Sequence, residues 1–172
     1  MTEAPAYLET GAGFSDCRVY RYTLWRIWDP GLPRLAFIGL NPSTATETVD
    51  DPTMRRCRGF AAREGYGGFD MLNIFGYRAT DPAEMKRQDE PVGPGNDAAI
   101  RDVSRRTGVV VACWGTHGGH LGRDSDVCAI LADEGVSVLC LGTTKQGFPR
   151  HPLYVKGDQP MVEFPVDLGS RH

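Results

Sequence analysis

Bulky and polar residues alternate along residues 18–28, which read RVYRYTLWRIW. The positions that share one side of this segment are Tyr20, Tyr22, Leu24 and Arg26. A period of two residues predicts a β-strand with one face packed against the rest of the protein. After turn residues at 29–31, residues 34–40 form a continuous apolar run. Such a run is typical of a strand that is covered on both faces.

The spacing of apolar residues becomes helical after residue 50. Asp51-Pro52 is typical of a helix start, because aspartate caps free backbone N–H groups and proline suits the first helical position. Gly65 ends this helix, a second such start follows at residues 81–84, and further helices are predicted over residues 96–106 and 124–134. Residues 69–75, 108–114 and 136–141 have the apolar character of buried strands.

This alternation of strands and helices predicts an α/β fold with right-handed crossovers. We expect a three-layer α/β/α sandwich with a mainly four-stranded parallel sheet, to which residues 18–28 add an antiparallel N-terminal edge strand. The 172 residues are expected to form a single α/β domain, with an irregular N-terminus over residues 1–16 and a mostly irregular tail over residues 156–172. One short strand is expected near Leu153–Val155.

Composition narrows the class of protein. Hydrophobic residues make up 41% of the chain and charged residues 24%, which argues against a disordered chain. No apolar run approaches the roughly 20 residues that cross a bilayer. The first residues, MTEAPAYLETGAGF, lack the basic start and apolar stretch of a secretory signal. A cytoplasmic protein with no membrane partner is therefore expected.

Net charge and cysteine content give two further expectations. The net charge of -3 argues against a protein that coats nucleic acid indiscriminately. The five cysteines are odd in number and contain no C-x-x-C pair, which predicts reduced, mostly buried thiols. They are Cys17, Cys57, Cys113, Cys128 and Cys140.

Polar residues follow each of the four predicted core strands. Ligands of open α/β sheets bind outside the carboxyl ends of the strands, so these loops are expected to form one site. The residues expected to contact a substrate are Pro42, Ser43, Thr44, Asn73, Arg78, Trp114, His117, Lys145, Phe148 and Arg150.

Four residues of these loops suit catalysis, namely Asn41, Asp50, Asp51 and His151. Pro42 restricts Asn41 to extended geometry, which suits the positioning of a water molecule, although Asn-Pro is also a turn signal. Asp50 or Asp51 suits a general base, although Asp51 is equally suited to capping a helix. A neutral His151 suits the stabilisation of a developing anion, or it is an exposed loop histidine.

Aromatic and basic side chains complete the expected site. Trp114 and Phe148 suit stacking on a nucleobase, or they cap the core. Arg78, Lys145 and Arg150 suit contact with phosphate. His117 and His120 form an H-x-x-H pair without a neighbouring carboxylate ligand, so neither a metal nor another cofactor is expected. Phosphate-binding, dinucleotide-binding and serine-hydrolase glycine motifs are not found in the sequence.

Several segments together resemble an uncharacterised bacterial family, catalogued as the domain of unknown function number sixteen forty-three. These segments are YRY at 20–22, LWR at 24–26, GLNPSTA at 39–45, DDPT at 50–53, residues 73–80 and residues 147–154. The resemblance covers nearly the whole chain and implies no known activity.

A more distant resemblance is to the uracil-DNA glycosylase superfamily, especially its mismatch-specific branch. Residues 39–43, GLNPS, resemble the Gly-x-Asn-Pro-Gly motif that supplies a water-positioning asparagine. Asn73-Ile74 and Arg78 resemble the segment after the family's second strand, and His151-Pro152 resembles its late His-Pro motif. The resemblance implies a four-stranded parallel α/β/α fold and a histidine that stabilises the departing base. Ser43 stands where the family has glycine, and the long apolar wedge loop is missing.

The leading hypothesis is hydrolysis or transfer at the N-glycosidic bond of a nucleobase in single-stranded nucleic acid or in a small nucleoside or nucleotide. Asn41 with Asp50 or Asp51 would activate water, and His151 would assist departure of the base. One alternative is a non-catalytic nucleotide- or nucleic-acid-binding module. The other is a metal-dependent hydrolase that uses His117, His120 and an aspartate. The sequence identifies no protein partner.

Overall fold

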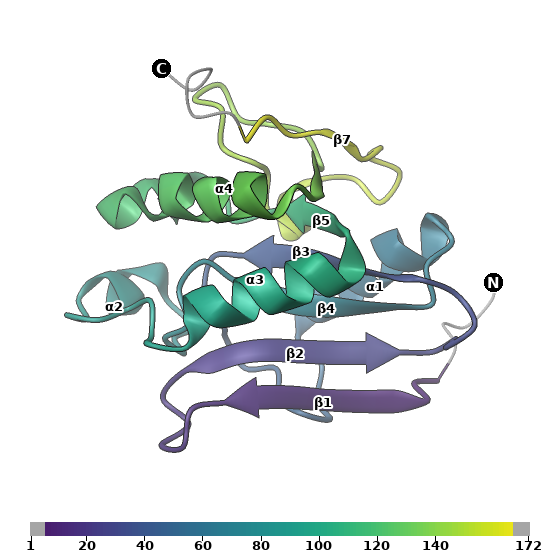
Figure 1. Ribbon diagram of the computed structural model, residues 1–172, viewed down its shortest axis with the longest axis horizontal. Coiled ribbons are helices and arrows are strands. Elements are labelled where there is room, and N and C mark those ends of the chain that lie inside the picture. Colours follow the sequence, from purple (N-terminus) through teal and green to yellow (C-terminus); the bar gives the residue numbers. More distant parts are fainter. Residues whose placement is uncertain (1–5, 167–172) are drawn as a thin grey trace.

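A seven-stranded mixed sheet forms the centre of the protein in the computed structural model, which describes residues 6–166 (Figure 1). The strand order is β1-β2-β4-β3-β5-β6-β7. The strands span Glu9–Phe14 (β1), Arg21–Ile27 (β2), Arg34–Gly39 (β3), Gly68–Asn73 (β4), Val109–Ala112 (β5), Ser137–Cys140 (β6) and Val162–Glu163 (β7). β4, β3, β5 and β6 pair in parallel, as predicted, and β1, β2 and β7 add antiparallel strands at the two edges.

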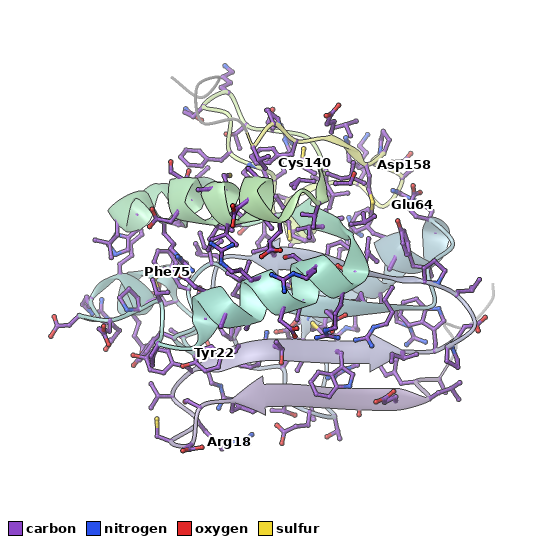
Figure 2. The ribbon with its side chains drawn as sticks, in the orientation of Figure 1. Arg18, Tyr22, Glu64, Phe75, Cys140 and Asp158 are labelled. Atoms are coloured by element: carbon purple, nitrogen blue, oxygen red, sulfur yellow. The ribbon has the colours of Figure 1, made fainter. Side chains whose placement is uncertain are left out.

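Helices pack on both faces of this sheet. Within residues 6–166, the α-helices span Pro52–Arg63 (α1), Pro82–Lys86 (α2), Asn96–Thr107 (α3) and Arg123–Glu134 (α4). α3 and α4 lie side by side over one face and α1 lies behind the sheet (Figure 1). One buried cluster joins α2, α3 and α4 to the sheet and includes Phe75 and Cys140, both labelled in Figure 2. A second cluster joins α1 to the opposite face through Met54, Cys57 and Phe60.

Local sequence explains where the helices begin and end. Asp51 caps α1, because its side chain accepts a hydrogen bond from the Met54 backbone N–H at 2.9 Å. Asp81 caps α2 in the same way through Ala83 N–H. α3 ends at Gly108, whose positive φ of 72° is a backbone conformation that glycine adopts at no steric cost.

The edges of the fold differ from the sequence prediction. Residues 1–16 were expected to be irregular, but Glu9–Phe14 form β1 and pair with β2, so β2 is not the edge strand. β1 went unrecognised because ETGAGF has no alternating pattern. The predicted strand near Leu153–Val155 is instead a 3-10 turn over Pro152–Tyr154, since proline lacks the N–H that a strand ladder needs. The tail is irregular up to residue 166 except for β7.

Two further features concern the class of protein. Within residues 6–166, no helix has both the length and the apolar character needed to cross a bilayer. All five cysteines are free thiols. Four of them are buried and Cys17 is exposed, which agrees with the predicted reduced thiols.

Candidate functional site

A cavity of about 670 Å³ opens beyond the carboxyl ends of β3, β4 and β5. It lies between the loop after β3, the start of α1 and the loop that carries His151. Of the residues singled out in the sequence, those that line it are Asn41, Ser43, Thr44, Asp51, Asn73, Trp114, His117, Arg150 and His151. Residues more than 100 positions apart in the chain therefore share one site.

The carboxamide of Asn41 is held in one orientation by backbone carbonyls. Its Nδ2 donates to the oxygens of Ala79 at 2.8 Å, Pro42 at 3.2 Å and Tyr77 at 3.4 Å. Its Oδ1 accepts no hydrogen bond from residues 6–166. The half-buried side chain can therefore offer an acceptor oxygen to a molecule in the cavity.

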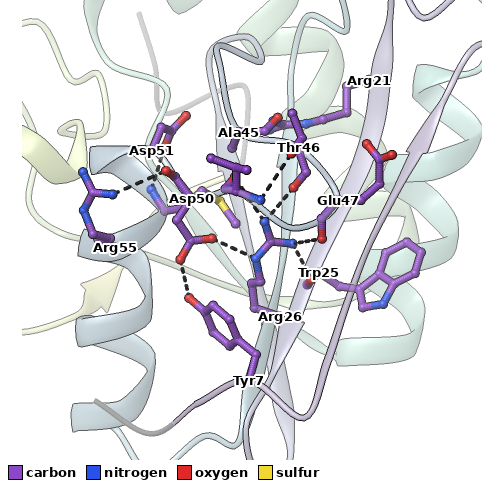
Figure 3. Close-up of polar contacts among 12 residues, drawn as sticks. Tyr7, Arg21, Trp25, Arg26, Ala45, Thr46, Glu47, Asp50, Asp51 and Arg55 are labelled. Atoms are coloured by element: carbon purple, nitrogen blue, oxygen red, sulfur yellow. Dashed lines mark hydrogen bonds and ion pairs between the residues drawn. The ribbon is translucent and has the colours of Figure 1, made fainter. Parts of the chain in front are cut away.

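Asp50 and Asp51 have different environments. The two oxygens of Asp50 accept hydrogen bonds from Arg26 Nε at 2.8 Å and from the Tyr7 hydroxyl at 2.6 Å (Figure 3). Asp50 does not line the cavity. Asp51 lines it, and only one oxygen of Asp51 is engaged in capping α1. Of the two carboxylates, Asp51 is therefore the one in a position to act on a ligand.

Asp50 belongs to a structural network that fastens the loop before α1. Besides the Asp50 contact, the buried guanidinium of Arg26 donates to the carbonyls of Trp25, Thr46, Glu47 and Val49 (Figure 3). Burial and the hydrogen bond to Asp50 raise the pKa of Tyr7 to about 12, so Tyr7 remains a hydrogen-bond donor at neutral pH.

A backbone hydrogen bond defines the tautomer of the neutral His151 ring. Its Nδ1 accepts from the Leu153 backbone N–H at 3.2 Å, so the proton of the neutral ring lies on Nε2. Burial lowers the pKa of His151 below its ordinary value, while the charge of Asp51 opposes that shift. Arg56 of α1 fixes this loop by donating to the carbonyls of Pro152 and Val155. The ring can therefore donate a hydrogen bond from Nε2 at neutral pH.

Asn73 and Trp114 form buried parts of the wall. Asn73 ends β4 and is 2% exposed, and its Nδ2 has no hydrogen-bond partner within the described chain. Trp114 is 1% exposed and meets Phe164 edge-on with ring centroids 5.8 Å apart. A buried amide donor without a partner is costly in a folded protein, so Asn73 is a candidate to bind a ligand acceptor.

Several residues predicted at the site lie away from the cavity. Arg78 lines a neighbouring groove of about 490 Å³, which shares Ser43, Thr44, Ala79 and Thr80 with the cavity. Lys145, Phe148 and Pro42 line neither. Phe148 lies beside the backbone of Gly119, and Pro42 is buried with its carbonyl bound to the Ala79 N–H.

Arg21 and Tyr154 are two of the cavity residues that were not predicted from the sequence. Arg21 begins β2 and is 3% exposed, although the alternating pattern placed it among ordinary polar strand positions. Tyr154 lines the cavity with 78% of its surface exposed, and its ring centroid lies 5.5 Å from that of His151. Arg21 was missed because its hydrogen-bond acceptor, the Ala45 carbonyl, lies 24 residues away. Tyr154 lies close to His151 in sequence, but no pattern distinguishes it from other tyrosines.

The two histidines of the H-x-x-H pair do not converge. His117 lines the cavity, whereas the His120 ring packs 5.7 Å from Phe75 between centroids. Over residues 6–166, no three His, Cys, Asp or Glu side chains gather in a group that could hold a metal ion. The described residues thus offer no ligand set for the metal-dependent alternative.

Comparison with known families identifies the chain. The family model described as "Protein of unknown function (DUF1643)" matches residues 21–153. The chain belongs to this family. No curated protein matches the chain, and no solved structure matches it either.

The matched region of this family member contains most of the cavity lining, from Arg21 to Leu153. Within it, Asn41 and Asp51 present acceptor oxygens and His151 presents a donor. An acceptor pair can orient and deprotonate water, and a neutral N–H can stabilise a leaving anion. The cavity therefore presents acceptor oxygens and a donor N–H that could contact one ligand.

Proposed function

We propose that this protein cleaves the N-glycosidic bond between a nucleobase and its sugar. The observation that carries the proposal is that Asn41, Asp51 and His151 line one cavity. Hydrogen bonds within the protein occupy Asn41 Nδ2 and His151 Nδ1, which supports Asn41 Oδ1 and His151 Nε2 as the atoms that bind a ligand. A cavity of about 670 Å³ is of the size that small-molecule sites have in proteins.

The reaction assigns one role to each of the three residues. Asn41 Oδ1 and the free oxygen of Asp51 accept hydrogen bonds from a water molecule. The water oxygen bonds to the anomeric carbon, the carbon–nitrogen bond breaks with its electron pair going to the base, and the released proton passes to Asp51. His151 Nε2–H donates to the base while its negative charge develops. Asn73 Nδ2 would recognise an acceptor on the base edge.

The substrate we propose is single-stranded nucleic acid or a small nucleoside or nucleotide. After His151 the chain makes one short 3-10 turn over Pro152–Tyr154, and the Val155 carbonyl that follows is bound to Arg56. A duplex enzyme must pull its target base out of the stack, and this short loop provides little surface for that. The net charge of -3 also favours a small or single-stranded ligand. The reduced thiols support a cytoplasmic setting for the reaction.

The test is the release of free base from a panel of single-stranded oligonucleotides with normal and damaged bases, nucleosides and nucleotides, measured by chromatography. Wild-type protein should release a base from at least one class. Asp51→Asn and His151→Gln should each slow release by about 100-fold or more, the lower range for general acid–base catalysis. Lys145→Gln is the matched control, because Lys145 is exposed and outside the cavity.

The second candidate is a binding module of the same fold without chemistry. It is favoured by the three backbone contacts of Asn41, which give that residue a structural role of its own. Calorimetric binding of a nucleotide with no base release from any substrate would select this candidate. Base release that depends on Asp51 would reject it.

A further inference from the structure

Arg21 is a buried cation that faces the cavity without a counter-charge in contact. Its side chain comes from the start of β2 and is 3% exposed. Nη1 donates to the Ala45 carbonyl at 3.0 Å, and the buried Nε has no partner within residues 6–166. A buried charge is costly unless it is paired and hydrogen-bonded. The guanidinium beside the cavity is therefore a buried charge with an unsatisfied donor, which is unfavourable for stability.

The charges around Arg21 leave it open to an anion. Asp51 is the carboxylate whose charge acts on it, but the two side chains form no ion pair. The positive charges of Arg78 and Arg26 lower the pKa of Arg21, whereas the charge of Asp51 raises it. Arg26 is already paired with Asp50. Burial, the largest cause, lowers the pKa of Arg21 to about 10, so the guanidinium is still protonated at neutral pH.

The start of α1 lies at the same cavity. Asp51, Pro52 and Thr53 line it, so this 12-residue helix directs its N-terminal end towards the space that Arg21 also borders. Asp51 already caps this helix end and Pro52 has no N–H, so the side chain of Arg21, and not the helix itself, is the group that can recognise an anion here. Arg21 supplies the forked donors that match the oxygens of a phosphate.

We propose that Arg21 binds a phosphate group of the ligand inside the cavity. Together with the proposed function, on which this identification of the ligand rests, the substrate is a nucleotide unit that carries its phosphate and not a bare nucleoside. The phosphate belongs either to a mononucleotide or to a single-stranded chain, and both contain the group that Arg21 recognises.

The first experiment separates phosphate recognition from base chemistry. Ribose 5-phosphate and ribose contain no base and cannot be substrates, so their binding can be measured by calorimetry without turnover. Ribose 5-phosphate should bind about 10- to 100-fold more tightly than ribose, the range expected for charge-assisted hydrogen bonds. Equal affinity of the wild-type protein for the two compounds overturns the proposal, whatever happens to any variant.

The second experiment assigns the preference to Arg21. Arg21→Met should abolish the phosphate preference, and Arg21→Lys, which keeps the charge but loses the fork, should retain part of it. The matched control is Arg123→Met, because Arg123 is equally buried but is paired with Asp97 and does not line the cavity. Retention of the full preference by folded Arg21→Met, or its loss in folded Arg123→Met, contradicts the assignment.

The proposed reaction and the proposed role of Arg21 can be contradicted independently. Base release from nucleosides at the same rate as from nucleotides, without phosphate preference, contradicts the role of Arg21 alone. Phosphate binding that depends on Arg21, with no release of any base, contradicts the proposed reaction alone. Comparison of 5′-mononucleotides with short single-stranded oligonucleotides then identifies the source of the phosphate.

Discussion

The two adjacent carboxylates after the first core strand should respond oppositely to mutation. Asp50→Ala removes the counter-charge of Arg26, whose side chain is fully buried, and leaves only backbone carbonyls around the guanidinium. Removing one partner of a buried ion pair costs about 3–5 kcal/mol. The Asp50 side chain is 15% exposed, so water reaches the pair and we expect about 3 kcal/mol.

That loss is large against a total stability of about 5–15 kcal/mol. Urea unfolding followed by tryptophan fluorescence, with linear extrapolation to water, gives the free energy of unfolding. Tyr7→Phe is a graded control, because it removes only the 2.6 Å hydrogen bond to Asp50 and should cost about 1 kcal/mol. A loss below about 1 kcal/mol for Asp50→Ala would refute the assignment of Asp50 to the Arg26 network.

Asp51→Asn provides the contrast. Asparagine caps a helix about as well as aspartate, so the hydrogen bond to Met54 can be kept. The charge that favours the buried Arg21 is lost, but Asp51 forms no ion pair with it, so stability should fall by less than in Asp50→Ala. The negative charge in the cavity is lost, and with it the proposed base for water. If folded Asp50→Ala loses more base release than Asp51→Asn, the roles of the two carboxylates are reversed.

Two further predictions concern His151 and the wall of the cavity. Burial lowers the folded-state pKa of His151 below 6.5, so the unfolded chain binds the proton more readily and stability is lost as pH falls from about 6.5 through the lowered value. The unfolding free energy of wild type minus that of His151→Gln should therefore be smaller at pH 5 than at pH 7.5. An unchanged difference would contradict a lowered pKa. Gly118→Ala would place a methyl group 2.2 Å from Trp114 Cδ1 and should cost about 1–3 kcal/mol with a shift in tryptophan fluorescence. Gly119→Ala, whose methyl would lie 3.4 Å from Phe148, should change neither, and equal effects of the two would exclude the close contact with Trp114.

The centre of the fold was predictable because its signals are local. The apolar run at residues 34–40 gave β3, and Asp51-Pro52 gave the cap and first turn of α1. β1 could not be predicted in the same way. Gly11 pairs with Trp25, and a Cβ at Gly11 would lie 2.2 Å from that ring, so its glycine is explained by a neighbour 14 positions away along the chain.

The candidate site was predictable only in part, for the same reason. Strand-end placement indicated Asn41 and His151, because the carboxyl ends of parallel strands share one edge. Arg21 was missed because its acceptor is the Ala45 carbonyl, 24 residues away. The structural role of Asp50 could not be predicted, because its partners Arg26 and Tyr7 lie 24 and 43 residues away.

The most direct measurement is base release in water enriched in oxygen-18, with both products analysed by mass spectrometry. Attack of water on the anomeric carbon predicts free base and sugar product in equal amounts, with one labelled oxygen on the sugar and none on the base. Asn41→Ala should greatly reduce both products, because it removes the acceptor that orients the water. Absence of free base from every substrate, or unchanged release by Asn41→Ala, would contradict glycosidic cleavage in this cavity.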